Sequence, residues 1–111
     1  MANSYKFKGV ALATGSETAL LTAASTETII IKSIRVSNNT SNTPTLSFDV
    51  SDSSASAEYT ILKTQTLAAN TAVEILTVPL VLEASDALKA TVSSSDSVHF
   101  GISYMSVTWS N

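Results

Sequence analysis

The sequence contains no cysteine, and it has few of the other residues that shape special backbone or catalytic sites. Its 111 residues include three glycines, two prolines and one histidine. Without cysteine, neither a disulfide framework nor a thiolate zinc site can form. The glycines, Gly9, Gly15 and Gly101, lie too far apart to form a phosphate-binding loop. Stability must therefore come from packing, from strand hydrogen bonds and from any oligomerisation.

Charged residues are also scarce, at 14% of the chain, against about 25% in an average globular domain. The formal net charge is −3 and the six basic residues are scattered, which argues against nucleic acid as a partner because phosphate binding needs clustered Lys and Arg. No apolar run approaches the length of a membrane span. No signal-peptide core precedes residue 15. We expect a protein retained in a cytoplasm, or assembled there into something larger, with no membrane partner.

Hydroxyl side chains take the place of charges, with 19 serines and 15 threonines in the sequence. Ser-rich chains of low hydrophobicity are usually disordered. Here 44% of the residues are apolar, and they are arranged with a strand period. We therefore expect one ordered domain over residues 1–111, in which residues 1–15 form an N-terminal strand or arm.

Residues 28–52 show the strand pattern most clearly. An apolar, β-branched run is followed by the polar turn NNTSNTP, and then Leu46, Phe48 and Val50 alternate with polar residues. The same arrangement recurs along the chain and predicts nine strands, at 5–12, 17–23, 28–38, 45–51, 58–64, 72–78, 80–83, 87–93 and 98–109. Short strands with frequent turns are typical of an all-β fold, here an antiparallel β-sandwich of about eight or nine strands. Jelly-roll-like and immunoglobulin-like topologies both fit.

The alternation within residues 28–38 is imperfect. Ile30 shares its phase with Lys32, whereas Ile31 shares its phase with Arg35. A bulge near Lys32, or a strand end covered on both faces, would explain this. The predicted core consists of Ile30, Ile34, Val36, Leu46, Phe48, Val50, Tyr59, Ile61, Val73, Ile75, Leu80, Leu82, Leu88, Val92, Val98, Phe100, Ile102 and Tyr104.

The last predicted strand carries apolar residues on both faces. Val98, Phe100, Ile102 and Tyr104 alternate on one face, and Met105, Val107 and Trp109 fall on the other. One interpretation is a strand end tucked under the N-terminal aromatics. The other is an exposed patch that contacts a partner, because aromatics and Met are enriched in interfaces. The candidate partner interface is Tyr5, Phe7, Met105, Val107 and Trp109.

No pattern of catalytic residues stands out. The single histidine, His99, is predicted to point away from the core, and the nucleophile motif G-x-S-x-G is absent. The acidic residues have no EF-hand spacing, although a calcium ion at the loop after Asp49 and Asp52 stays an alternative. Two glycosylation sequons, beginning at Asn38 and Asn39, are interpreted as turn residues. We expect no catalytic residue, no cofactor and no metal site, and hence a protein that is not an enzyme.

Several segments resemble a recurring small virion protein of tailed bacteriophages. The pattern consists of I-K-S-I-R-V-x-N at Ile31–Asn38, a loop-and-strand pair at Leu67–Leu76, L-x-x-x-D-x-L-x-A at Leu82–Ala90 and V-x-x-x-x-S-Y at Val98–Tyr104. The resemblance covers roughly residues 28 to 108. It is carried by strand and turn residues, and the N-terminal 25 residues match the pattern less well.

The resemblance implies a non-enzymatic β-sandwich that is built into the virion in many copies. The first expectation is a capsid decoration or cement protein that stabilises the head by binding between subunits of the major capsid protein. A tail, neck or fibre component is the alternative, and a glycan-binding module of a receptor-binding apparatus is the second alternative. The expected partners are other virion proteins and further copies of the chain, with a trimer favoured by capsid local symmetry.

Overall fold

The computed structural model describes residues 2–12, 15–76, 78–93 and 97–109 of the chain. These residues form nine strands and no helix, and none of them belongs to a helix that could cross a membrane. The prediction of an all-β fold is confirmed. The strands are β1 (Ala2–Leu12), β2 (Thr18–Thr22), β3 (Glu27–Asn38), β4 (Thr45–Asp52), β5 (Ala57–Thr66), β6 (Ala72–Glu74), β7 (Leu80–Leu82), β8 (Ala87–Val92) and β9 (Val98–Thr108).

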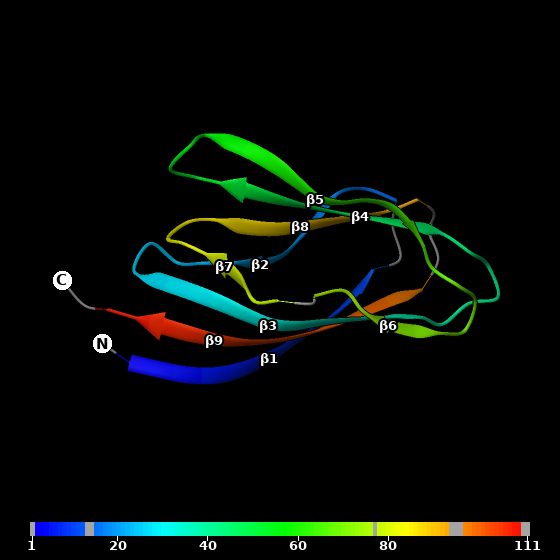
Figure 1. The fold of residues 1–111 in the computed structure, drawn as a ribbon, viewed down its shortest axis with the longest axis horizontal. Coiled ribbons are helices and arrows are strands. Elements are labelled where there is room, and N and C mark those ends of the chain that lie inside the picture. Colours follow the sequence, from blue (N-terminus) through cyan, green and yellow to red (C-terminus); the bar gives the residue numbers. More distant parts are fainter. Residues whose placement is uncertain (1, 13–14, 77, 94–96, 110–111) are drawn as a thin grey trace.

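The strands form two antiparallel sheets that face each other as two layers (Figure 1). Sheet A has the order β1-β9-β3-β6, with β7 also paired to β3, and sheet B has the order β2-β8-β4-β5. If β6 and β7 together fill one position, this is the strand order of a jelly roll, in which the chain crosses between sheets in two Greek keys. Of the two topologies left open by the sequence, the jelly roll is therefore the observed one.

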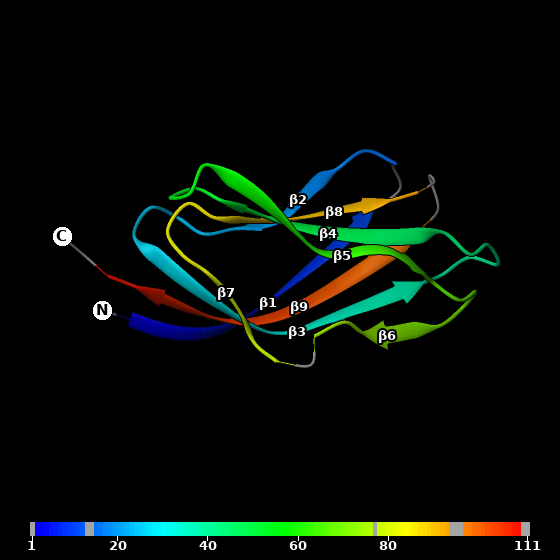
Figure 2. The ribbon, with the colours of Figure 1, turned by 45° about the horizontal axis from the view of Figure 1, so that its top comes forward.

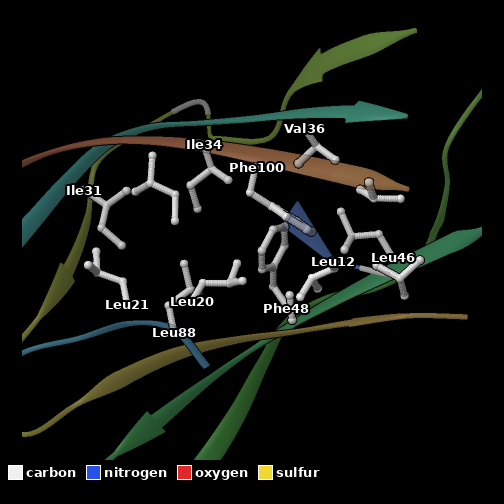
Figure 3. Packing of buried hydrophobic residues seen from close by; sticks show 14 of the residues in the cluster. Leu12, Leu20, Leu21, Ile31, Ile34, Val36, Leu46, Phe48, Leu88 and Phe100 are labelled. Atoms are coloured by element: carbon white, nitrogen blue, oxygen red, sulfur yellow. The ribbon is translucent and has the colours of Figure 1, made fainter. Parts of the chain in front are cut away.

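The core lies between the sheets and contains apolar side chains from both (Figure 3). At its centre Phe48 of β4 meets Phe100 of β9 edge to face, with ring centroids 5.9 Å apart. This geometry places the positive edge of one ring against the negative face of the other. It stabilises the fold by about 1 kcal/mol beyond the contribution of the buried apolar area. Sequence alternation correctly predicted this pair and most of the core. It missed Leu20 and Leu21 in the short strand β2, both of which are buried.

A bulge in β3 explains the imperfect alternation of that strand. The pairing of β3 with β9 shifts between Ile31 and Ser33, so Lys32 is the extra residue. Before the bulge Ile29 and Ile31 are buried, and after it the core face passes to even-numbered residues. The expected bulge is confirmed, but the placement of Ile30 in the core is wrong. Ile30 points outward, because the bulge reverses the phase between it and Ile34.

Because of the bulge, the adjacent residues Ile30 and Ile31 should contribute differently to the free energy of unfolding. We expect Ile31→Thr to lower the free energy of unfolding by about 2 kcal/mol, because it removes apolar volume and places a hydroxyl in the core. The same change at half-exposed Ile30 should cost less than about 1 kcal/mol. Urea denaturation of both variants measures the difference. Equal losses at the two positions would contradict the observed register.

Three other residues predicted for the core are exposed. Tyr59 and Ile61 are 54% and 40% exposed in β5, which is the outer strand of sheet B. Ile61 has no partner in the ladder, because Leu62 pairs with Phe48 and Thr60 with Asp49. Val73 is 39% exposed in the three-residue strand β6. Each residue lies at the margin of a sheet, where the opposite sheet does not cover it. The alternation of apolar residues in the sequence does not indicate which strands lie at a margin.

Strand β6 is shorter than the predicted 72–78, of which residue 77 lies outside the described residues. The side chain of Glu74 turns back and accepts hydrogen bonds from the backbone N–H of Ile34, at 2.8 Å, and of Leu76, at 3.3 Å. It also accepts a hydrogen bond from the hydroxyl of Ser33. The carboxylate therefore takes the N–H of Ile34, whereas the carbonyl of Ile34 still accepts from the N–H of Ile75 at 2.9 Å. Regular pairing of β6 ends at this point.

Buried Asn38 connects two loops at one end of the sandwich. Its side-chain amide donates to the carbonyls of Asn42, Leu67 and Ala68 at 2.9–3.3 Å. Its side-chain oxygen accepts from the N–H and the hydroxyl of Thr40, at 3.1 and 2.8 Å. The first sequon residue is thus the buried last residue of β3 and not part of the turn, although its side chain holds the turn through Thr40.

Candidate functional site

The outward-facing side of sheet A carries a row of apolar residues from four adjacent strands. Ile30 of β3 lies opposite Val81 of β7 on one side and opposite Met105 of β9 on the other. Met105 in turn lies opposite Tyr5 of β1. Directly opposed residues in antiparallel strands point to the same face. The register therefore aligns Val81, Ile30, Met105 and Tyr5 across the whole width of the sheet.

Two further apolar residues flank this row. Phe7 follows Tyr5 by two residues on β1, and Val107 follows Met105 by two residues on β9, so both share its face. We call the six residues Tyr5, Phe7, Ile30, Val81, Met105 and Val107 the apolar outer face. Tyr5, Phe7 and Val81 are 78%, 70% and 51% exposed. Contiguous apolar surface of this kind marks interaction sites on folded proteins.

Four of the five residues predicted as a partner interface therefore share one face. The fifth, Trp109, lies just beyond β9. Its backbone N–H donates to the backbone carbonyl of Thr26 at 3.1 Å, which extends the pairing of β9 with β3. Sequence reasoning missed Ile30 and Val81. The run of three isoleucines at 29–31 could have indicated an exposed Ile30. Successive side chains of a strand point to opposite faces, so at least one of the three must lie on the outer face.

Phe7 has a structural task besides its exposure. Gly9 and Gly101 lie opposite each other in the β1–β9 ladder, and the ring of Phe7 covers them. A Cβ atom added to Gly101 would lie 3.1 Å from the ring of Phe7. Aromatic side chains that cover strand glycines support local pairing. Tyr5 has no such task, so it is the cleaner position for testing the apolar outer face.

Most of β1 extends beyond the cover of sheet B. Residues Ala2 to Gly9 are all exposed, and only Leu12 is buried. The inward-facing residues of this part include Lys6 and Lys8, opposite Tyr104 and Ile102. The charge of Lys6 also reaches the carboxylate of Glu27. Burial acts to raise the pKa of Glu27, but hydrogen bonds from the N–H of Ala24 and the hydroxyl of Ser106, together with Lys6, lower it overall.

The outward-facing side of sheet B carries a small acidic cluster. Carboxylate oxygens of Glu17, Asp49 and Glu58 lie within 4.8 Å of one another, and Lys89 forms an ion pair with Glu58 at 3.1 Å. A hydrogen bond with Asp49 raises the pKa of Glu17, and burial and the charge of Glu58 act in the same direction. Lys89 offsets part of this repulsion. Sequence spacing could not reveal this cluster, because its members come from three separate segments.

The acidic cluster should make the folding stability fall as the pH rises toward neutrality. The raised pKa of Glu17 means that its contribution to stability is present in acid and is lost as the pH rises through that pKa. We therefore expect Glu17→Gln to raise the unfolding free energy at pH 7, by less than about 1 kcal/mol because the site is exposed. The gain should disappear near pH 4. Denaturant melts at the two pH values test this.

Glu27 is a control for this prediction, because its pKa is shifted in the opposite direction. Its lowered pKa means that its contribution is present at neutral pH and is lost in acid. Glu27→Gln should therefore destabilise the protein at pH 7 and have little effect at pH 3. If Glu17→Gln and Glu27→Gln shifted stability in the same direction at pH 7, the assigned electrostatics would be wrong.

The remaining candidate residues do not form a catalytic arrangement among the described residues. His99 is exposed, and its Nε2 lies 3.4 Å from the hydroxyl of Ser97. No carboxylate within the described ranges forms a hydrogen bond with its ring. An open depression of about 400 Å³ at the β4–β5 turn is lined by serines, Asp52 and Glu58. The residues that line it are mostly polar, and none of them is an aromatic residue that could stack on a sugar ring.

No protein-family model matches this sequence, and no curated protein matches it. A chain in the structure of infectious bursal disease virus, Gx strain, has a TM-score of 0.59 at 14% identity, covering 96% of this chain and 32% of the viral chain. A chain of Bacillus endospore appendages, which form a novel family of disulfide-linked pili, has a TM-score of 0.56 at 7% identity, covering 97% and 89%. A chain of the cyanophage Pam1 capsid asymmetric unit reaches 0.44 at 13% identity, covering 93% and 84%, a score too low for argument.

The first two likenesses establish the fold and nothing finer, because both identities are below 15%. The present chain spans about a third of the length of the viral chain. It also differs from the appendage protein in a decisive respect, since a sequence without cysteine cannot be disulfide-linked. Any assembly of this chain therefore forms without disulfides.

Proposed function

We propose that this protein is a non-enzymatic structural component of a virion, and that it decorates and stabilises the capsid. One observation carries the proposal: the apolar outer face spans four strands of a sheet that the other layer leaves open on that side. An apolar surface on a chain with few charges needs a protein partner to remove it from water. The partner we propose is the major capsid protein or a neighbouring virion protein.

Three further observations support this role. The jelly-roll topology is common in viral capsid proteins, although it is also found in lectins, so it supports the class and not the site. A chain of a virus structure shares the fold. The sequence resembles small virion proteins of tailed phages over roughly residues 28 to 108. The polar turns, rich in Ser and Thr, lack the aromatic residues that a glycan-binding site would use.

Localisation on the particle tests this proposal. Purified virions would be labelled with gold-conjugated antibody against this chain and imaged. Label distributed over the head is the expected result. Label confined to the tail or neck would replace the decoration role with that of a tail component, and absence of label from virions of the source virus would contradict a virion role altogether. Binding on a glycan array would instead favour the lectin alternative.

A further inference from the structure

Sheet A ends in a strand whose outer edge is long and unpaired. Strand β1 contains eleven residues and pairs with β9 in an unbroken register, from Ala2 opposite Thr108 to Leu12 opposite Val98. On its other side no strand among the described residues pairs with it, and it is the outermost strand of its layer (Figure 2). An edge of this kind presents unsatisfied backbone N–H and C=O groups that can template another strand.

The other sheet edges of this protein are protected. Strands β6 and β7 contain three residues each. Strand β2 contains five residues, and its pairing shifts between Ala19 and Leu21. The pairing of β5 shifts twice along its length, next to Phe48. Short strands and bulges are the usual devices against edge-to-edge pairing. Strand β1 has neither a bulge nor a proline. Its inward-facing Lys6 and Lys8 are the only charges along this edge, and they limit the registers in which the edge can pair.

We propose that two copies of this chain pair through their β1 edges, antiparallel and about a twofold axis, so that their A sheets become one continuous sheet. A twofold contact uses the same surface on both copies, and it therefore closes at a dimer instead of continuing into a filament. A threefold ring would require β1 to pair with a different edge, and the other edges are protected. We therefore propose a dimer, where capsid symmetry had favoured a trimer.

The lysines of β1 disfavour the registers that are centred on Lys6 and on Phe7, and they permit the register that is centred on Tyr5. With Tyr5 on the axis, Lys6 lies opposite Ser4 of the second copy and Lys8 lies opposite Ala2. With Lys6 on the axis, that lysine lies opposite itself, and with Phe7 on the axis Lys6 lies opposite Lys8. Like charges placed directly opposite each other destabilise a strand pair. The Tyr5 register avoids both conflicts while pairing residues 2–8.

The Tyr5 register also joins the two apolar outer faces. The row that runs from Val81 through Ile30 and Met105 to Tyr5 continues across the axis into Tyr5 of the second copy. A dimer then presents one apolar surface of twice the width to a particle, and two linked contacts bind more tightly than one. This last consequence rests on the proposed function, whereas the pairing itself rests only on the edge of β1.

Single-cysteine variants test the pairing and its register, because the natural sequence has no cysteine. Directly opposed antiparallel residues have Cα atoms about 4.5–5.5 Å apart, within the range that a disulfide can bridge. We expect Tyr5→Cys to form a cross-linked dimer under mild oxidation. Asn3→Cys is the matched control, an exposed position two residues from Tyr5 on the same face. In this register its two copies are four residues out of alignment, about 14 Å apart, and they should not cross-link.

Sedimentation of the wild-type chain completes the test, with a concentration-dependent dimer as the expected result. A folded chain that stays monomeric at every concentration, with Tyr5→Cys uncross-linked, would overturn the inference, and so would a trimer. Preferential cross-linking of Lys6→Cys or Asn3→Cys would overturn the proposed register. A monomer whose outer face still binds particles would remove the dimer and leave the proposed function intact, so the two failures can be told apart.

Discussion

Replacing Asn38 by alanine is expected to lower the free energy of unfolding by about 3 kcal/mol, a large share of the stability of a small domain. The variant removes an amide that donates to three carbonyls and an oxygen that accepts from Thr40. Of the carbonyls, that of Leu67 belongs to a buried residue. Unpaired buried polar groups incur the full desolvation cost. Equilibrium denaturation in urea measures the loss.

Asn38→Asp separates hydrogen bonding from side-chain volume. The aspartate has nearly the same shape, but it presents an oxygen in place of the amide that faces three carbonyls. We expect it to be at least as destabilising as alanine at pH 7 and less so in acid, where a protonated carboxyl can donate. The exposed neighbour Asn39 supplies the control, since Asn39→Ala should change stability by less than about 0.5 kcal/mol. Equal effects at the two asparagines would refute the assigned network.

Replacing Tyr5 and Val81 together by serine is expected to weaken binding to particles by about 30-fold or more, which corresponds to about 1 kcal/mol for each lost contact. The two residues lie at the two ends of the apolar row, and both are exposed, so the fold should tolerate the change. Binding would be measured by co-sedimentation of purified chain with particles produced without it. Thermal melts of the variant confirm that it stays folded.

Tyr59 and Ile61 provide a matched control for this variant. They offer a similar pair of exposed apolar side chains on β5, in the other sheet. The double change to serine there should leave particle binding within about twofold of wild type, because surface apolar residues outside an interface contribute little to affinity. If the β5 variant lost binding and the variant of Tyr5 and Val81 kept it, the binding surface would have been assigned to the wrong sheet.

Most of the fold could be predicted from the sequence, because strand alternation and turn residues are local signals. All nine strands occur close to their predicted positions, and the bulge near Lys32 was visible as a break in phase. What alternation could not supply was the place of each strand in its sheet. Tyr59 and Ile61 have the pattern of core residues, yet β5 is an outer strand. Strand order decides which residues are covered, and it depends on contacts that are distant in sequence.

The candidate site was predictable only in part, for the same reason. The apolar residues of the first and last strands stood out because they break the alternation of an otherwise regular pattern. Ile30 and Val81 did not, because their membership of the apolar outer face depends on which strands are neighbours. The meeting of Glu17 with Asp49 was equally hidden. A register that joins distant segments is a property of the folded chain and has no local signature.

The most direct test is a cryo-electron microscopy reconstruction, at a resolution that places individual strands, of the virus particle to which we propose this protein belongs. The account predicts density for this jelly roll on the capsid, with sheet A facing the particle and with Tyr5 and Met105 covered by a neighbouring protein. Density in which sheet A faces solvent, while sheet B or the loops make the contact, would contradict it. In that case the apolar outer face would not be the surface that attaches this protein to the virion.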